Sequence, residues 1–168
     1  MRGKQMTESM QPDTPAVRFL RGEGVAYTEH CYVYEEGGGT EVCAQALNVD
    51  EHSIVKTIVL EADGKPILVL MHGDMRASAK ELARIAGVKA VIPCARDKAE
   101  EYTGYEVGGI SPFGTCKEIP VYMEETILNL RKIYINGGRK GFFIGMDPYD
   151  AVKVLRAVLV KVGSARGA

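Results

Sequence analysis

The sequence SIVKTIVLEADGKPILVLMHGD at residues 53–74 predicts a β-hairpin. Two runs of β-branched and aliphatic residues flank the pair Asp63-Gly64, which favours a two-residue turn with positive φ angles. Both faces of the first run are mostly apolar. This hairpin is the strongest local structural signal in the chain.

Short helices and strands are expected on both sides of the hairpin. Thr14 is a natural N-cap, and Pro15 suits the first position of a helix that ends at the glycines of RGEG. Thr40 is expected to cap a second helix, and Asp147 caps a later one that starts with proline. The expected helices cover 15–24, 40–47, 77–87, 95–104, 125–130 and 148–157, and the other expected strands cover 25–34, 88–92, 119–124, 131–137, 141–146 and 158–162.

This order of elements lacks the long strand–helix–strand alternation of a doubly wound parallel sheet. We therefore expect an α/β fold of the α+β type. Its sheet is mixed, largely antiparallel, and curled or closed into a barrel, with short helices at the periphery. No linker divides the chain, so one domain is expected over residues 14–162, with a polar flexible leader at 1–13 and a flexible tail at 163–168.

The composition excludes several classes of protein. The 168 residues contain no run of about 18 apolar residues, so no membrane span is expected. The polar N-terminus lacks the apolar segment of a secretory signal, which favours a cytoplasmic protein with reduced thiols. The four cysteines form no CxxC pair and only three histidines accompany them, so we expect no metal and no other cofactor.

The charge is unevenly distributed along the chain. The net charge is −1, but residues 131–168 hold eight Lys/Arg and two acidic residues, 8 − 2 = +6, which leaves −7 for the remainder. The chain is therefore not a generally basic nucleic-acid binder, and a polyanion would be attracted to the C-terminal part alone. An ordinary solvated surface explains the same clustering.

Lys56 is unusual because it lies within the apolar run 54–60 of the first hairpin strand. Alternate residues of a strand share a face, so its neighbours on that face are Ile54, Ile58 and Leu60. Burial of an unpaired ammonium is costly. Lys56 therefore either extends to water from the end of the strand or faces a cleft that receives an anion or a carbonyl group.

Two glycine-rich segments are the other candidate sites. Residues 103–114 are too rich in glycine for a regular element, and such a segment presents bare backbone N–H groups to a ligand or is simply a surface loop. The segment 136–141 is a hairpin turn, or a tight loop where Arg139 and Lys140 meet phosphates. Neither matches GxxxxGK[ST] or GxGxxG. His72 could pair with Asp74, although a structural role is favoured, and no catalytic triad is recognised.

Taken in order, three motifs resemble the YbaK/ProX family. These motifs are Val55-Lys56-Thr57, the segment Thr103-Gly104-Tyr105 that leads to Gly108-Gly109-Ile110-Ser111-Pro112, and Ile135-Asn136-Gly137-Gly138-Arg139-Lys140-Gly141. The opening TPAVRFLRGEGVAYTEHCY is also similar, and the resemblance covers residues 14–162. The family comprises aminoacyl-tRNA deacylases and the editing domain inserted in bacterial prolyl-tRNA synthetases. A free-standing chain of this length is similar to the Cys-tRNA(Pro) deacylases.

The resemblance implies a compact, barrel-like mixed sheet and hydrolysis of the ester that joins a wrong amino acid to tRNA. It also implies contact with the tRNA acceptor end, and prolyl-tRNA synthetase as a partner that could deliver the tRNA. It assigns the catalytic role to Lys56. The implied substrate-binding residues are Tyr32, Thr57, Gly108, Gly109, Ser111, Pro112, Asn136, Gly137 and Gly138, and the implied tRNA contacts are Arg139 and Lys140.

Three positions depart from the family pattern and bear on amino-acid specificity. Asn136 stands where family members often have serine, Phe143 stands where some members have an acidic residue, and the glycine run at 37–39 stands where some have an aromatic residue. An activated ester needs orientation and charge stabilisation more than a protein nucleophile. We therefore expect substrate-assisted hydrolysis with Lys56 as the orienting residue. The alternative is a non-catalytic module that binds aminoacyl-tRNA or an amino-acid derivative.

Overall fold

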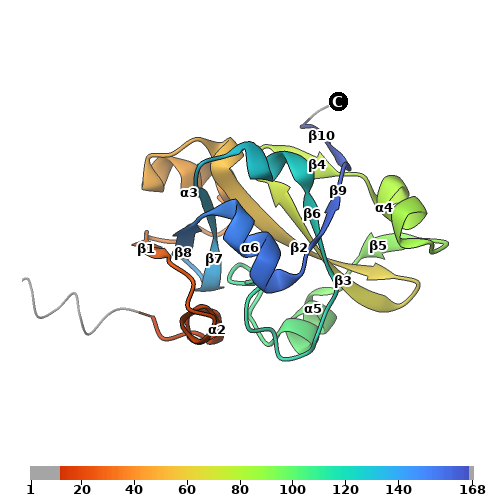
Figure 1. Ribbon diagram of the computed structural model, residues 1–168, viewed down its shortest axis with the longest axis horizontal. Helices are drawn as coiled ribbons and strands as arrows, with labels where there is room; N and C mark the ends of the chain where they lie inside the picture. Colours follow the sequence, from red (N-terminus) through yellow and green to blue (C-terminus); the bar gives the residue numbers. More distant parts are fainter. Residues whose placement is uncertain (1–11, 167–168) are drawn as a thin grey trace, which may run out of the picture.

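Eight strands form the main sheet of the computed structural model, which describes residues 12–166 (Figure 1). Along the sheet they are ordered β1 (Thr28–Cys31), β8 (Phe142–Met146), β7 (Ile133–Arg139), β2 (Ile54–Ala62), β3 (Lys65–His72), β6 (Val121–Glu124) and β9 (Val158–Val160), while β5 (Val91–Pro93) pairs with β2. The two ends of this order, β1 and β9, do not pair within the described residues. The curled mixed sheet is therefore confirmed, and it is open.

The predicted hairpin lies at the centre of this sheet. Strands β2 and β3 pair antiparallel up to Ala62 and Lys65, which close the two-residue turn. Asp63 and Gly64 have φ angles of 47° and 81°, as the turn requires. Strand β7 then pairs with β2 in parallel and with β8 antiparallel. The mixed character of the sheet comes from this parallel contact and from those that join β6 to β3 and to β9.

Five α-helices are present in the described part of the chain, together with two 3₁₀ turns. The helices are α2 (Pro15–Gly22), α3 (Gly39–Leu47), α4 (Ala79–Ala86), α5 (Arg96–Thr103) and α6 (Pro148–Leu155), and the turns are η1 (Glu51–Ser53) and η2 (Glu125–Asn129). Thr14 and Asp147 cap α2 and α6 as predicted. The predicted Thr40 cap is wrong: α3 begins at Gly39, and the Thr40 hydroxyl donates to Glu51 instead.

The structure also corrects the predicted limits of one strand and of the C-terminal tail. The predicted strand 25–34 is shorter and covers only Thr28–Cys31. Residues 163–165, predicted as part of a flexible tail, form strand β10 (Gly163–Ala165), which pairs with β4 (Met75–Ala77). Most of the predicted leader, residues 1–11, lies outside the described residues, as do residues 167–168.

The hydrophobic core covers both faces of the central sheet. Leu68 and Leu70 of β3 belong to the cluster that also contains Phe113. The alternate residues Val69 and Met71 belong to a second cluster on the other face. A strand buried on both faces is apolar at every position, which explains the continuous run in the hairpin sequence.

In the described residues, no helix combines the length and the hydrophobicity that a membrane crossing requires.

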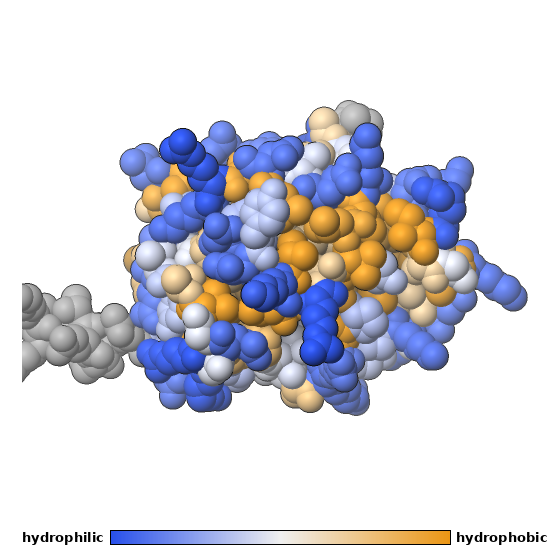
Figure 2. All heavy atoms as spheres, in the orientation of Figure 1, coloured by the Kyte–Doolittle hydropathy of each residue, from blue (hydrophilic) through white to orange (hydrophobic). Residues whose placement is uncertain are grey.

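Figure 2 shows apolar side chains gathered on the visible face between α6 and α4, where strand β9 runs. Val158 and Leu159 of this strand are 51% and 43% exposed. Strand β9 lies at one end of the strand order and pairs with β6 alone.

Candidate functional site

A cavity of about 380 Å³ opens where strands β2 and β7 separate. The two strands pair in parallel only at Ile54 with Tyr134 and at Val55 with Ile135. Beyond these pairs β7 is bulged over residues 136–139, so the sheet splits. The cavity is lined by Tyr32, Tyr34, Gly37, Gly39, Thr40, Val55, Lys56, Thr57, Val107, Gly108, Ile110, Asn136 and Phe143.

Lys56 is half-buried in the lining of this cavity. Its Nζ makes one long hydrogen bond, at 3.5 Å, to the backbone carbonyl oxygen of Gly73. Burial lowers the pKa of the Lys56 ammonium below that of an ordinary lysine, and the positive charge of Arg166 lowers it further. The sequence left two possibilities for the Lys56 side chain, extension to water or a position facing a cleft. The structure shows the second.

Thr57 is a second polar residue in the lining of the cavity. Across residues 12–166, its Oγ1 is the one buried side-chain polar atom that has no hydrogen-bond partner. A buried hydroxyl without a partner is costly unless a ligand or water satisfies it. Counted back from Ala62 to Lys56, every second residue of β2 directs its backbone N–H and C=O groups towards β3. Thr57 lies between two of these residues, so its own N–H and C=O groups point the other way, into the split beside β7.

An aromatic wall stands opposite these polar groups. The rings of Tyr32 and Phe143 lie 6.0 Å apart between centroids, and Tyr34 also lines the cavity. Burial and the neighbouring Cys43 raise the pKa of Tyr32 to about 12, so this phenol is neutral at physiological pH. Phe143 thus gives the cavity an apolar surface.

The two glycine-rich segments form one continuous wall. A Cβ atom on Gly109 would lie 2.8 Å from the Lys140 backbone nitrogen and 2.9 Å from the Arg139 carbonyl carbon. Asn136 Nδ2 donates to the Gly108 carbonyl at 3.3 Å. The backbones of segments 103–114 and 136–141 therefore touch, and only glycine fits between them.

Asn136 also shapes the second segment itself. Its Oδ1 accepts hydrogen bonds from the backbone N–H groups of Gly138, at 2.7 Å, and of Arg139, at 3.2 Å. Its side chain is buried and lines the cavity. Asparagine thus closes the turn that interrupts β7 and directs its amide group towards Gly108.

The predicted substrate-binding residues divide into two groups in the structure. Tyr32, Thr57, Gly108 and Asn136 line the cavity with Lys56. The other five do not line the cavity; they are Gly109, Ser111, Pro112, Gly137 and Gly138. Ser111 Oγ, for example, is buried and accepts from the Phe113 N–H.

The two predicted tRNA contacts lie at the rim. Arg139 is exposed. The Lys140 Nζ lies 3.4 Å from a Glu106 carboxylate oxygen, 3.9 Å from one of Glu36, and 5.3 Å from the centroid of the Tyr34 ring. Lys140 therefore connects the loop before α3 to the loop after α5 at the cavity mouth.

Sequence reasoning missed a polar cluster beside Lys56. Thr40 Oγ1 lies 2.8 Å from Glu51 Oε1 and 3.1 Å from the Gly73 carbonyl oxygen. Arg166 Nη2 contacts the same two oxygens at 2.6 Å and 2.7 Å. Because Glu51 and Arg166 are 115 positions apart, no local pattern could have linked them.

The possible pairing of His72 with Asp74, which the sequence did not favour, is not formed, since Asp74 pairs with His52 at 2.9 Å. These three residues bring potential metal-ligand atoms within 4.8 Å of one another. However, the two imidazole rings are stacked 3.7 Å apart and nearly parallel, and both nitrogens of His72 already contact His52 O and Thr126 Oγ1. Nitrogen lone pairs lie in the ring planes and do not converge here, so the arrangement fits a structural cluster better than a metal site.

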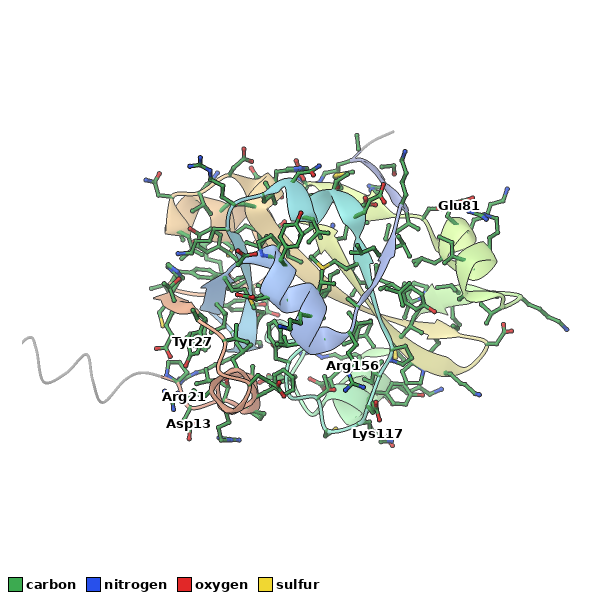
Figure 3. All side chains as sticks on the ribbon, viewed as in Figure 1. Asp13, Arg21, Tyr27, Glu81, Lys117 and Arg156 are labelled. Carbon is green, nitrogen blue, oxygen red and sulfur yellow. The ribbon has the colours of Figure 1, made fainter. Side chains whose placement is uncertain are left out.

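A second hollow, of about 440 Å³, lies between α2, α6 and the 112–121 loop. Pro112 lines this hollow rather than the cavity at Lys56. Lys117 and Arg156 also line it, and Figure 3 shows these two side chains together below α6. Glu118 gives the lining mixed charge. No buried unpartnered side-chain atom of the described residues lies here, which favours the Lys56 cavity as the functional site.

Comparisons with known proteins found similar sequences and similar structures. The sequence profile described as the aminoacyl-tRNA editing domain matches residues 35–154. A protein of Enterococcus faecalis named as a candidate Cys-tRNA(Pro)/Cys-tRNA(Cys) deacylase, EbsC, is 29% identical over 140 residues, 82% of this chain and 85% of that protein. A proline–tRNA ligase of Lactobacillus helveticus is 28% identical over 102 residues, 61% of this chain but 18% of the ligase.

Solved structures share the fold. A crystal structure described as a candidate trans-editing enzyme for prolyl-tRNA synthetase has a TM-score of 0.80 and 20% identity, and covers 92% of this chain and 100% of that one. The hypothetical protein APE2540 has a TM-score of 0.82 and 25% identity, and covers 89% and 99%. The fold is therefore shared over nearly the whole length of both structures.

Proposed function

Because the chain belongs to the aminoacyl-tRNA editing domain family, we propose that it is a trans-editing deacylase that hydrolyses the ester of mischarged tRNA. The substrate that we propose is Cys-tRNA(Pro), in keeping with the name of the Enterococcus relative. The single observation that carries the proposal is the ammonium of Lys56, which is half-buried in a cavity beside the unpartnered hydroxyl of Thr57.

Lys56 supplies electrostatic stabilisation in this mechanism. Ester hydrolysis places negative charge on the carbonyl oxygen in the transition state, and a fixed positive charge in a partly desolvated site stabilises that charge more strongly than water does. The Thr57 backbone N–H faces the same split and is placed to orient the acyl group. The aromatic wall of Tyr32 and Phe143 encloses the amino-acid side chain.

The attacking nucleophile comes from the substrate or from water. Among the described residues that line the cavity, none is cysteine, serine, histidine, aspartate or glutamate. The chain thus places no general base there of the kind that activates a protein nucleophile. In our proposal, a water held by the ribose hydroxyl, or the cysteine thiol of the mischarged tRNA, attacks the ester carbonyl. The ester C–O bond then breaks and the tRNA leaves with a free ribose hydroxyl. Attack by water gives free cysteine directly, whereas attack by the thiol gives a cyclic thioester that water then hydrolyses to cysteine.

The rim supplies the tRNA contacts in this proposal. Arg139 and Lys140 lie next to the cavity wall, and the C-terminal 38 residues carry a net charge of +6. Lys140 is partly neutralised by Glu36 and Glu106, so its contact with phosphate requires these acidic groups to be displaced. Phosphate contacts dominate nucleic-acid affinity, and so few of them favour weak binding by this chain alone. Delivery of the tRNA by prolyl-tRNA synthetase is therefore part of the proposal.

A single-turnover assay with a panel of aminoacylated tRNAs tests the function. Cys-tRNA(Pro), Cys-tRNA(Cys), Ala-tRNA(Pro) and Pro-tRNA(Pro) are incubated with excess protein, and the remaining ester is followed over time. We expect amino acid to be released from Cys-tRNA(Pro) faster than in buffer, while Pro-tRNA(Pro) stays intact. Protection of the ester in every case would identify a binding module, and no effect on any tRNA would exclude both functions.

The lowered pKa of Lys56 predicts a pH dependence. The ammonium is charged below its pKa and neutral above it, so the deacylation rate is expected to fall as the pH rises through a value below the 10.5 of an ordinary lysine. The rate is measured by rapid quench and corrected for spontaneous hydrolysis at each pH. In the Lys56→Arg variant the guanidinium stays charged, so any residual activity should lack this alkaline decline. The same decline in both proteins would contradict the assignment.

A further inference from the structure

Residues 162–166, here called the arm, reach the rim of the site. Strand β10 pairs with β4, and Glu124 Oε1 accepts hydrogen bonds from Val162 N at 2.9 Å and Gly163 N at 2.6 Å. Glu124 is itself buried. A Cβ on Gly163 would lie 2.9 Å from the same carboxylate oxygen, so the arm passes close to the Glu124 side chain. This path carries Arg166 to the polar cluster beside Lys56.

Arg166 occupies the hydrogen-bond acceptors that lie nearest to Lys56. Its Nη2 contacts Glu51 Oε1 at 2.6 Å and the Gly73 carbonyl oxygen at 2.7 Å. The Lys56 Nζ approaches that same carbonyl only to 3.5 Å. The stronger, shorter contacts therefore belong to the arginine, and the lysine keeps a single long one.

We propose that Arg166 is a positioning residue for Lys56: it neutralises Glu51 and holds the Gly73 carbonyl, so that neither group draws the Lys56 ammonium out of the cavity. Without the guanidinium, the Glu51 carboxylate would lose its cationic partner, and Glu51 and the Gly73 carbonyl would keep only the Thr40 hydroxyl beside a mobile lysine side chain. The ammonium would then bind Glu51 as an ion pair, and its charge would be directed away from the incoming ester.

The electrostatics of the cluster agree with this role. The pKa of Lys56 is lowered by burial and by Arg166 and Arg76, whereas Glu51 and Asp74 act to raise it. Loss of Arg166 removes a positive charge and also leaves Glu51 unopposed, so both changes raise the pKa of Lys56. Loss of the Glu51 charge acts in the opposite direction. The two substitutions should therefore compensate.

A double-mutant cycle tests the proposal, and its activity arm rests on the proposed deacylase function. We expect Arg166→Gln to slow single-turnover deacylation of Cys-tRNA(Pro) by about tenfold, and Arg166→Gln with Glu51→Gln to recover most of the wild-type rate. Lys80→Ala removes one positive charge from an exposed position of α4, outside the C-terminal residues proposed to contact tRNA, and serves as the control, with an expected change of less than about twofold. The proposal would be overturned if Arg166→Gln were as active as the wild type. It would also be overturned if the double variant were no more active than Arg166→Gln alone.

A measurement without substrate separates this inference from the function. Lysine labelled with ¹³C at Cε is titrated by NMR, and the Lys56 resonance is assigned from the Lys56→Arg variant. The pKa of Lys56 should rise in Arg166→Gln and return towards the wild-type value in the double variant. An unchanged pKa in Arg166→Gln would refute the positioning role even if the wild-type protein deacylates tRNA. The shift and its compensation would support the role even if none of the tested tRNAs is hydrolysed.

Discussion

Lys56→Ala is expected to slow the deacylation of mischarged tRNA by about 10²–10³-fold, the usual effect of removing one preorganised oxyanion-stabilising group. The lysine is the charged residue in the lining of the cavity, and no general base accompanies it there among the described residues. Alanine removes the charge without creating an unsatisfied partner, because Arg166 still donates to the Gly73 carbonyl. The free energy of unfolding should therefore change by less than about 1 kcal/mol.

The comparison is made by single-turnover kinetics and by denaturant unfolding of the same preparations. Lys65→Ala is the matched control, since Lys65 begins the partner strand of the same hairpin and is exposed. It should leave the rate within about twofold of the wild type, because exposed charges far from the site contribute little. Full activity in Lys56→Ala, with the fold intact, would show that the cavity works without its ammonium.

Gly109→Ala is expected to damage both stability and activity. The new Cβ would lie 2.8–3.0 Å from backbone atoms of Arg139 and Lys140, which cannot rotate away as a side-chain end does. The two glycine segments must separate, at a cost of about 1–3 kcal/mol typical of overpacking. A wall displaced by even 1 Å misplaces the acyl group, and we expect deacylation to fall by about 10²-fold.

Gly22→Ala is the control for this substitution. Gly22 ends helix α2, and a Cβ there meets no atom within 4 Å, so alanine should be neutral or slightly stabilising. Urea unfolding gives the stability of both variants, and single-turnover kinetics under native conditions give their activity. If Gly109→Ala were as stable and as active as Gly22→Ala, the close contact between the two glycine segments would not matter for the site.

Much of the local structure is predictable because it depends on residues that are near in sequence. Asp63-Gly64 predicts the central turn, and Thr14 and Asp147 predict helix starts. These signals work through backbone dihedral preferences and short-range hydrogen bonds. The Thr40 prediction fails for a related reason: its hydroxyl finds Glu51 and the Gly73 carbonyl in the folded protein, and these partners compete with a capping bond.

The site was predictable only in part. Lys56 stands out because a lysine within an apolar strand needs an explanation, and Asn136 stands next to a conspicuous glycine pair. Which residues line the cavity depends on where β7 leaves β2, and this is set by the bulge at residues 136–139. Ser111 and Pro112, which the family resemblance also suggested, do not line it.

From the order of its residues alone, this chain specifies its turns, its helix caps, its buried central strands and the position of one costly lysine. These properties depend on contacts within a few residues. Tertiary structure alone decides that the sheet splits beside that lysine, that Asp74 pairs with His52, and that Arg166 reaches Glu51 from 115 positions away. Pairings over such distances are chosen by the packing of the whole domain, which no short stretch of sequence encodes.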